Sequence, residues 1–472
     1  MSRLVAVSNR VALPKRGRPA GGLAVGLLSA LNAHGGVWFG WSGKTCEGES
    51  GEVKTTASGK ITFATFDINA QEYESYYNGF SNNTLWPLFH SLLGFFSYSR
   101  EHYDAYQRVN GLFARRLLPL LRPDDIIWVH DYHLLPLAAE LRRAGATQPI
   151  GFFLHVPFPS YDVLRALPRY DEILRALSVY DVVGVQTRRD LWALQDCFSK
   201  PENDAIVDAD GTIRAFGRTF RTGAFPIGIE VGACRALAEQ NLRHPQVAKL
   251  AARLGRRKLM IGVDRLDYSK GLVLRFRAVE SLLASYPEHR GEVVFMQIAP
   301  PTRTGVRTYR EIRQELEQVS GHVNGLYADI DWTPIRYLNR SYDRGVVMAL
   351  LRIARVGLTT PIRDGMNLVA KEYLASQDPD DPGVLVLSKL CGAAEELDAA
   401  VLVNPYDQQG VADAIARAIE MPLAERRTRH RELLSCLERN DVHNWSRRFL
   451  AALEATRHDP GVGSRLARAG GA

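Results

Sequence analysis

Short apolar runs, each followed by a polar loop and then a segment of helical spacing, recur along most of this 472-residue chain. Residues 4–7, 125–129 and 150–154 show the pattern in the first half, and residues 259–263 and 356–359 show it in the second half. Strands that alternate with helices predict parallel sheets covered by helices on both faces. Because the chain exceeds one ordinary core, we expect an α/β fold with two doubly wound, Rossmann-like sheets, one in each half.

We expect the first domain to span residues 1–231 and the second to span residues 232–445. A last helix at 446–458 is expected to pack back on the first domain, and the small, basic tail at 459–472 is expected to be disordered. Alternating apolar positions at 36–66 predict a hairpin region. Ligands of doubly wound sheets bind beyond the carboxyl ends of the strands. Two such domains facing each other would enclose a cleft, and we expect the active site there.

The composition excludes several classes of protein. The net charge is +7, but the basic residues are interleaved with acids and form no nucleic-acid motif, so we expect no nucleic-acid partner. No apolar run approaches the roughly 18 residues of a membrane helix, and the first residues do not form a signal peptide. The five cysteines are scattered and never spaced as CxxC, which argues against a disulfide framework or a zinc site and for a cytoplasmic location.

One loop in the second half joins a strand end, an acidic residue and a helix start. It follows the apolar run at 356–359, and helical spacing begins at Asn367. A helix N-terminus suits a phosphate, and Glu372 could accept hydrogen bonds from the hydroxyls of a sugar. Asp364 and Asn367 would serve equally well as plain helix caps. This stretch alone does not decide between the two interpretations.

Two cations, Arg265 and Lys270, follow the apolar run at 259–263. Together they could hold a diphosphate and neutralise the charge that develops on it as it leaves. Because their loop lies at the carboxyl end of an apolar strand, we favour this role over a solvated loop of paired charges. Gly21 and Gly22 precede a helix and would let the backbone approach a phosphate, although a plain turn explains them equally well.

Polar residues end the other apolar runs as well. Arg10 and Arg303 carry guanidinium groups that suit a phosphomonoester, with surface charge as the alternative. Asp131 and His155 could contact sugar hydroxyls or be satisfied structural groups.

Aromatic residues crowd the segment that follows the expected hairpin. Trp41, Tyr77 and Trp86 could stack on a sugar ring. At this density aromatic residues more often form core, and core is the interpretation we favour for them.

Three motif-like stretches are rejected. Gly43-Lys44-Thr45 resembles the end of a P-loop but lacks the upstream glycine, and no GxGxxG follows a strand. Residues 208–212 read Asp-Ala-Asp-Gly-Thr, which matches a metal-binding DxD of glycosyltransferases and a phosphatase nucleophile motif. An Asp-Gly turn between two short apolar segments explains the same residues, so a hairpin is expected.

Taken together, these stretches resemble the α,α-trehalose-phosphate synthases (UDP-forming), a family of retaining glycosyltransferases with two facing Rossmann-like domains, the GT-B architecture. The matching segments are LVAVSNRV, GGLAVGL, WFGWSG, YYNGFSN, LWPLFH, IIWVHDYHLLPLA, GFFLHVPFPS, FPIGIE, DRLDYSKGL, QIAPPTR, RDGMNLVAKEY and VNPYD. They span nearly the whole chain in order, and residues 199–224 match least.

The resemblance implies that glucose is transferred from UDP-glucose to D-glucose 6-phosphate, giving α,α-trehalose 6-phosphate and UDP. This reaction belongs to trehalose biosynthesis, which serves stress response and osmoprotection. The resemblance also implies that no metal or other cofactor is needed and that the protein forms a homo-oligomer, either a dimer or a tetramer. No residue in the sequence chooses between UDP, ADP and GDP as the donor nucleotide.

The resemblance further assigns residues to the site. The glucose 6-phosphate pocket is expected to contain Arg10, Tyr77, Trp86, Asp131 and Arg303. The donor pocket is expected to contain Gly21, Gly22, Arg265, Lys270, Tyr342, Leu368, Val369, Ala370, Lys371 and Glu372. Catalytic roles are expected for His155 and Asp364 on the transferred glucose and for Arg265 and Lys270 on the diphosphate. Trp86 and Val156 match positions linked to the choice of acceptor anomer.

Two alternatives remain. The same fold could use glycerol 3-phosphate as the acceptor and make a glucosylglycerol phosphate, although Tyr77 and Trp86 suit a hexose better. The chain could instead be a non-catalytic sugar-phosphate sensor, and the intact set of Arg10, Arg265 and Lys270 argues against that.

Overall fold

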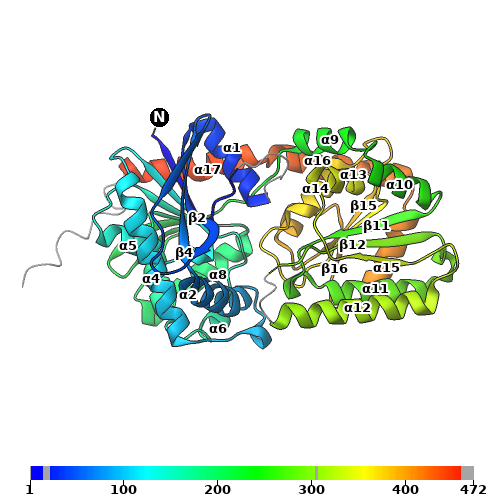
Figure 1. Ribbon diagram of the computed structural model, residues 1–472, viewed down its shortest axis with the longest axis horizontal. Coiled ribbons are helices and arrows are strands. Elements are labelled where there is room, and N and C mark those ends of the chain that lie inside the picture. The colour runs from blue at the N-terminus through cyan, green and yellow to red at the C-terminus, as the bar shows by residue number, and fades with distance from the viewer. Residues whose placement is uncertain (1, 14–21, 303–306, 459–472) are drawn as a thin grey trace, which may run out of the picture. The chain divides into compact units, whose positions relative to one another are not determined.

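The computed structural model describes residues 2–13, 22–302 and 307–458. They fall into two compact units (Figure 1). Unit 1 comprises the described residues up to 227 together with those from 442 onward, and unit 2 comprises those of 228–441. The chain therefore leaves unit 1 four residues before the expected boundary. The expected tail at 459–472 lies outside the described residues.

Unit 1 is built around a ten-stranded sheet in the order β3-β4-β2-β1-β5-β6-β7-β10-β9-β8. Its strands are β1 (Leu4–Arg10), β2 (Gly36–Cys46), β3 (Lys54–Ser58), β4 (Ile61–Asn69), β5 (Ile126–His130), β6 (Ile150–Phe153), β7 (Val182–Val185), β8 (Ile206–Val207), β9 (Thr212–Ala215) and β10 (Arg218–Ala224). From β4 to β10 in this order all neighbours are parallel, and only the two edges are antiparallel.

The hairpin expected over residues 36–66 is only partly correct. β3 and β4 form an antiparallel hairpin, but β2 lies between β1 and β4 and is parallel to both. β2 is buried over Val37–Trp41, as a central strand must be, whereas every residue of β3 is exposed, as suits an edge.

Helices cover both faces of the unit 1 sheet. They are α1 (Gly22–His34), α2 (Ala70–Glu72), the π-helix η1 (Tyr73–Leu85), α3 (Trp86–Phe89), α4 (Arg100–Leu117), α5 (Leu137–Arg143), α6 (Tyr161–Leu164), α7 (Tyr170–Leu177), α8 (Arg188–Phe198) and α17 (Val442–Ala455). Short 3₁₀ turns are η2 (Leu93–Phe95), η3 (Leu118–Leu120), η4 (Tyr132–Leu134), η5 (Pro201–Asn203) and η9 (Thr456–His458).

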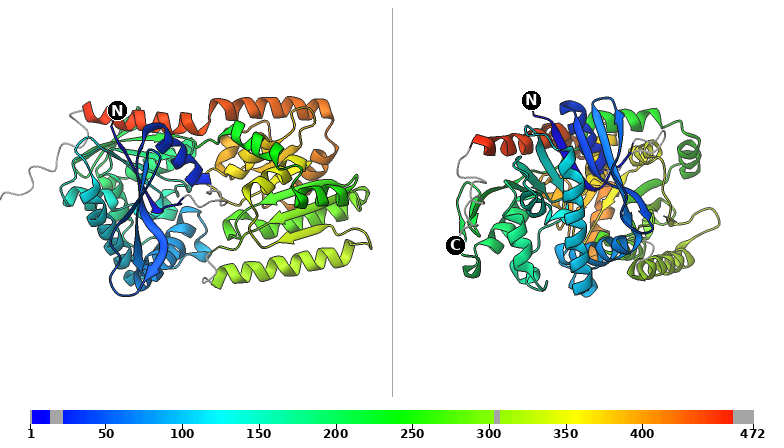
Figure 2. Two further views of the ribbon diagram at one scale, coloured as in Figure 1. Left: turned by 45° about the horizontal axis from the view of Figure 1, so that its top comes forward. Right: turned by 60° about the vertical axis from the view of Figure 1, so that its left-hand side comes forward.

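The last helix, α17, lies beside α1 and belongs to unit 1 (Figure 2). Its Trp445 and Phe449 rings pack 4.8 and 4.9 Å from the ring of Trp128 on β5. Gly151 on β6 makes room for this helix, because a Cβ there would lie 2.7 Å from the Phe449 ring. The core of unit 1 therefore includes residues from both ends of the chain.

Unit 2 contains a fully parallel six-stranded sheet in the order β13-β12-β11-β14-β15-β16. Its strands are β11 (Lys258–Val263), β12 (Val293–Ile298), β13 (Ile335–Leu338), β14 (Val356–Thr359), β15 (Val384–Ser388) and β16 (Val401–Val403). Its helices are α9 (Val231–Gln240), α10 (Pro245–Leu254), α11 (Leu272–Ser285), α12 (Arg307–Tyr327), α13 (Arg344–Ile353), α14 (Leu368–Ser376), α15 (Gln408–Glu420) and α16 (Leu423–Arg439), with 3₁₀ turns η6 (Tyr268–Lys270), η7 (Pro287–His289) and η8 (Gly392–Glu395).

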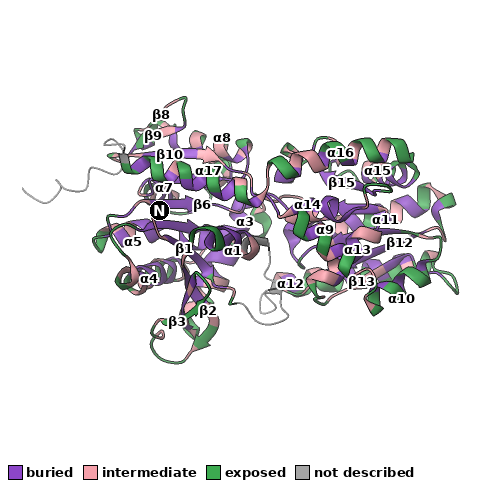
Figure 3. Cartoon of the chain, turned by 90° about the horizontal axis from the view of Figure 1, so that it is seen from above, coloured by how far each residue is buried: buried purple, intermediate pink, exposed green. Residues whose placement is uncertain are grey.

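Two helical layers sandwich the unit 2 sheet. Helices α9, α10, α13 and α14 contact one another on one face, and α11, α12 and α15 do so on the other (Figure 1). Apart from the half-buried edge strand β13, the strands are mostly buried, and the outward helix faces are exposed (Figure 3). The prediction of two parallel sheets, one in each half, is confirmed. None of the helices in the described part of the chain is both long and apolar enough to cross a membrane.

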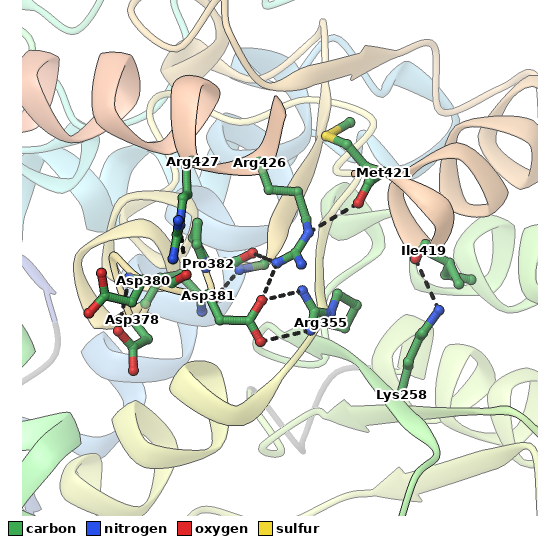
Figure 4. A network of polar contacts seen from close by, with 12 residues as sticks. Lys258, Arg355, Asp378, Asp380, Asp381, Pro382, Ile419, Met421, Arg426 and Arg427 are labelled. Atoms are coloured by element: carbon green, nitrogen blue, oxygen red, sulfur yellow. Dashed lines mark hydrogen bonds and ion pairs between the residues drawn. The ribbon is translucent and has the colours of Figure 1, made fainter. Parts of the chain in front are cut away.

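A charged network closes the amino edge of the unit 2 sheet (Figure 4). Both carboxylate oxygens of Asp381 accept hydrogen bonds from Arg355, each at 3.1 Å, and one also accepts from Arg426 on α16 at 2.6 Å. Arg426 donates in addition to the carbonyls of Met421 and Pro382. At this edge the charges pair with one another, which fixes α16 to the sheet.

Candidate active site

The loops that follow β11 and β14 meet at the carboxyl edge of the unit 2 sheet. The backbone N–H of Ile362 donates to the carbonyl of Ser269 at 2.9 Å. Gly271 has φ +62°, and a Cβ there would lie 2.7 Å from the carbonyl oxygen of Thr360. Only glycine fits so close an approach in that conformation. The structure thus joins the two loops that the sequence had singled out separately.

The centre of this edge is an ion pair between two predicted site residues. Lys270 Nζ lies 2.5 Å from Asp364 Oδ2, and their side chains are 11% and 13% exposed. Burial alone would lower the pKa of Lys270, but the charges of Asp364 and then Asp264 outweigh it and leave that pKa raised. Lys270 is therefore a fixed cation at neutral pH. Asp364 also accepts a hydrogen bond from Asn367 Nδ2 at 3.0 Å.

The start of α14 is capped by Asn367, which has φ +76° and accepts a hydrogen bond from Ala370 N at 3.2 Å. The capping interpretation is thus confirmed for Asn367. Asp364 does not cap the helix itself but accepts a hydrogen bond from the side-chain amide of Asn367. Leu368 and Val369 are half-buried at the first turn, where backbone N–H groups of a helix point outward. The arrangement presents a helix N-terminus beside the Lys270 ammonium.

A fully buried arginine that the sequence analysis missed organises this edge. Arg275 on α11 is 1% exposed, and its guanidinium donates to Asp264 at 2.6 Å, Gln297 at 2.8 Å and Thr360 Oγ1 at 2.9 Å. Asp264 follows β11, Gln297 lies on β12 and Thr360 follows β14. Arg275 therefore holds the ends of three strands in register. In the sequence, the position of Arg275 on the apolar side of a helix was the available sign that it is buried.

Glu372, expected in the donor pocket, is held by a second unforeseen arginine. Its Oε1 accepts a hydrogen bond at 3.0 Å from Arg344 at the start of α13. Burial raises the pKa of Glu372, and the charge of Arg344 opposes that rise. One carboxylate oxygen of Glu372 is thus fixed by Arg344.

The side chains of two other predicted donor residues are engaged within unit 2. Lys371 is fully buried, and its ammonium lies 2.6 Å from Glu396, so any donor contact of Lys371 would come from its backbone. The hydroxyl of Tyr342 accepts a hydrogen bond from Arg340 Nε at 2.6 Å, and the Arg340 guanidinium lies 4.9 Å from the Tyr342 ring. Arg265 is exposed.

In unit 1, two predicted residues are linked by Trp41 at the carboxyl edge of the sheet. The Arg10 guanidinium, at the exposed end of β1, lies 5.9 Å from the Trp41 ring. The ring of Tyr77, on η1, lies 6.0 Å from that of Trp41 and stacks on His133 at 5.6 Å. Arg10 and Tyr77 thus border one aromatic surface.

Trp86 and Val156 are core residues, 5% and 6% exposed. The Trp86 ring packs 4.1 Å from His90 and 5.7 Å from Tyr132. This agrees with the core interpretation of the aromatic segment. Gly22 is the first residue of α1, whereas Gly21 and Arg303 lie outside the described residues.

His155 follows β6 and takes part in a short imidazole chain. Its Nε2 lies 3.1 Å from Nδ1 of the buried His130, and its Nδ1 lies 3.5 Å from Nε2 of Gln186. The Gln186 amide is oriented by Ile227 N–H, which donates to Oε1 at 3.1 Å, so its NH₂ donates to His155 Nδ1. The proton of His155 then sits on Nε2 and faces His130. The neighbouring Asp131, at φ +76°, accepts from His155 N at 3.3 Å.

Burial lowers the pKa of His155 to about 3, and burial followed by the nearby His155 lowers that of His130. In the unfolded chain each pKa is about 6.5, so below that pH the unfolded state binds protons that the folded state refuses. We expect the free energy of unfolding of unit 1 to fall by up to about 1.4 kcal/mol per pH unit for each of these histidines as the pH drops from 6.5 toward 3. Urea unfolding of wild type and His155→Gln between pH 7 and 5 checks this. The variant should show the shallower slope, and equal slopes would contradict the assignment.

The Asp-Ala-Asp-Gly-Thr stretch is a hairpin, as predicted. β8 and β9 pair antiparallel, and Gly211 in the turn has φ +86°. Asp210 Oδ1 accepts from Thr212 N at 3.0 Å, and Asp208 pairs with Arg214 at 2.9 Å. Both carboxylates therefore serve the hairpin itself.

Comparison with known proteins adds to this geometry. A sequence model of glycosyltransferase family 20 matches residues 12–455. The trehalose-6-phosphate synthase of Cronobacter sakazakii (strain ATCC BAA-894) is 50% identical over 455 residues, which cover 96% of this chain and 95% of that protein.

Solved structures of trehalose-phosphate synthases are also similar to this chain. The α,α-trehalose-phosphate synthase (UDP-forming) of Burkholderia xenovorans in complex with glucose-6-phosphate superposes with a TM-score of 0.93 at 50% identity, covering 96% of this chain and 100% of that one. An E. coli structure described as trehalose-6-phosphate bound with UDP-2-fluoro glucose superposes with a TM-score of 0.92 at 49% identity, covering 96% of this chain and 99% of that one.

Proposed function

Because this chain belongs to glycosyltransferase family 20, we propose that it transfers glucose from UDP-glucose to D-glucose 6-phosphate, giving α,α-trehalose 6-phosphate and UDP. The structural observation that carries the proposal is the Lys270–Asp364 pair beside the N-terminus of α14. It places a fixed cation, a carboxylate and a helix N-terminus at one sheet edge. The cation and the helix N-terminus suit a diphosphate, and the carboxylate suits the hydroxyls of a sugar.

On the donor side, Lys270, Arg265 and the start of α14 hold the diphosphate of UDP-glucose. As the glycosidic bond breaks, negative charge develops on the departing phosphate, and fixed cations lower the energy of that state without reorganising. Arg344 aims Glu372 so that its second oxygen can accept hydrogen bonds from the ribose hydroxyls.

On the acceptor side, Arg10 and Arg303 would bind the phosphate of glucose 6-phosphate, and Tyr77, Trp86 and Asp131 of unit 1 would contact its ring. The surface formed by Trp41 and Tyr77 supports this role, since aromatic faces suit the apolar side of a hexose. Of the proposed groups, Arg10, Tyr77, Trp86 and Asp131 belong to unit 1, whereas Arg265, Lys270 and Glu372 belong to unit 2.

The reaction proceeds with retention of configuration and without a protein nucleophile. The anomeric hydroxyl of the acceptor attacks on the face that the diphosphate leaves, and its proton passes to the departing phosphate oxygen. Asp364 is the obvious candidate for a covalent nucleophile of the kind found in retaining glycosidases. Lys270 and Asn367 both donate to its Oδ2, which draws negative charge away from the carboxylate and makes it a weaker nucleophile. Mass spectrometry of enzyme stalled with a 2-fluoro donor should find no glucosyl–Asp364 adduct, and such an adduct would refute this mechanism.

We also propose that no metal is required. The Asp208→Asn/Asp210→Asn variant should keep the wild-type kcat/KM, because both carboxylates are used in the hairpin. UDP release measured with and without EDTA should likewise be equal. Loss of activity with EDTA would contradict the proposal, and loss in the variant as well would restore the metal-binding interpretation of that stretch.

Further properties of the family extend the proposal. The protein is a cytoplasmic homo-oligomer, a dimer or tetramer, that acts in trehalose biosynthesis under stress. Its five cysteines are all free, which fits a reducing compartment.

A UDP-release assay across donors and acceptors tests the function. UDP-glucose with glucose 6-phosphate should give the highest kcat/KM. The kcat/KM values with ADP-glucose and GDP-glucose show the preference for the donor base. A preference for glycerol 3-phosphate would assign a glucosylglycerol-phosphate synthase. No nucleotide release from any pair would assign a sugar-phosphate sensor instead.

A further inference from the structure

A pocket of about 240 Å³ lies in unit 2 between helices α10 and α13 and the edge strand β13. Four cationic side chains line it: Lys249 and Arg253 from α10, Arg336 from β13, and Arg340 from the loop that follows β13. None of the described residues in its lining is acidic. Cations gathered in a hollow with low-dielectric walls focus a positive potential there.

The described part of the protein does not neutralise these four cations. Among the described residues no carboxylate forms an ion pair with any of them, whereas Arg257 nearby pairs with Asp331 at 2.5 Å. Burial lowers the pKa of Arg336, and the charges of Arg253 and Arg257 lower it further. An anion in the pocket would relieve this repulsion.

The rest of the lining sets the kind of anion. Leu250, Met296 and Val346 form an apolar wall that suits a carbon skeleton. The volume lies below the roughly 300–1,000 Å³ of ordinary small-molecule sites, so the ligand is small. A phosphomonoester carries about −1.5 to −2 charges and three acceptor oxygens at pH 7, and arginines bind it in a bidentate manner. A phosphate ester matches several cations better than a single carboxylate does.

We propose that this pocket binds a small organic phosphate through cations other than the donor diphosphate residues Arg265 and Lys270. Tyr342, which is expected in the donor pocket, also lines it. The site communicates with the donor through Arg340, which donates a hydrogen bond to the Tyr342 hydroxyl. A phosphate that draws the Arg340 guanidinium into the pocket removes that bond and changes the position of Tyr342. This communication rests on the proposed function, because the donor role of Tyr342 is part of it.

Calorimetric titration of the full chain with ribose 5-phosphate tests the site, with UDP present to fill the donor pocket. The variant Arg253→Gln/Arg336→Gln should bind at least tenfold more weakly than wild type. The control Lys60→Gln/Arg431→Gln removes the same charge from exposed positions outside the pocket and should bind as wild type does. Equal affinity in all three proteins would overturn the proposal.

Two further measurements are needed. One distinguishes a free phosphate ion from a phosphate ester as the ligand, and the other distinguishes the phosphate site from the proposed donor site. Inorganic phosphate that binds as tightly as ribose 5-phosphate identifies the free ion as the ligand, and weaker binding identifies an ester. Ribose 5-phosphate should change the UDP affinity of wild type by about fivefold or more, and by less in the pocket variant. UDP binding without this change would overturn the communication. No UDP binding at all would overturn the donor assignment while the phosphate site stands.

Discussion

Arg265→Ala should lower kcat/KM for UDP release by about 10²–10³, the usual cost of removing one group that stabilises developing charge. Arg265 is exposed in a loop at the carboxyl edge of the unit 2 sheet, so its removal takes away a contact to the diphosphate with little effect on the fold. Steady-state kinetics with UDP-glucose and glucose 6-phosphate give the ratio. Thermal unfolding followed by circular dichroism should be unchanged.

Lys270→Ala should lose at least as much activity, and it should also destabilise unit 2, because it leaves the carboxylate of Asp364 without its cation. The control Arg431→Ala removes an exposed charge on α16 and should behave as wild type in both assays. Wild-type turnover in both Arg265→Ala and Lys270→Ala would refute the donor assignment.

Arg275→Met should lower the free energy of unfolding of unit 2 by about 3–5 kcal/mol, the cost of breaking a buried ion pair from one side. The change leaves Asp264 buried without its partner and removes the hydrogen bonds to Gln297 and Thr360. Hydrogen exchange of peptides from β11, β12 and β14 measures the loss where it occurs. Activity should fall as well, because the same bonds hold the loops of Lys270 and Asp364.

Two matched variants make this test specific. Arg277→Met lies two residues away on the same helix but is exposed, so it should change stability by no more than about 0.5 kcal/mol. Adding Asp264→Leu to Arg275→Met removes the orphaned charge and should recover part of the lost stability, but not the activity. Unchanged exchange in Arg275→Met would show that the arginine does not hold the strand ends.

Local pattern was enough to predict most of the fold and the outline of the candidate site. Each apolar run with polar residues at its end became a parallel strand with those residues at its carboxyl edge, as for β11 and β14. The hairpin at 208–212 also depends on neighbours in sequence and was predicted, and the cap at Asn367 was one of the two interpretations left open for that loop. The family resemblance supplied what spacing cannot, namely the substrates and the roles of residues such as Tyr342.

Features that depend on distant partners were not predictable in this way. Nothing near Arg275 or Arg344 shows that one meets Asp264, Gln297 and Thr360 or that the other holds Glu372, because these contacts form only when separate strands and helices assemble. The parallel pairing of β2 with β1 and β4 was mistaken for a hairpin for the same reason. The short edge strand β13 is half-buried over most of its length and lacks the apolar run that marks the others.

The place of α17 in unit 1 bears on the order in which the chain can fold during synthesis. Residues 228–441 of unit 2 are synthesised before residues 442–455, yet Trp128 and Gly151 need that helix to cover them. Arg457 then donates a hydrogen bond to Ser2, near the other end of the chain. It also donates to the carbonyls of Asp124 and Asp125, just before β5. Unit 1 contains the residues that are made first, yet it is the unit that is completed last. A released chain that ends before residue 442 should contain a closed unit 2 and an unfinished unit 1.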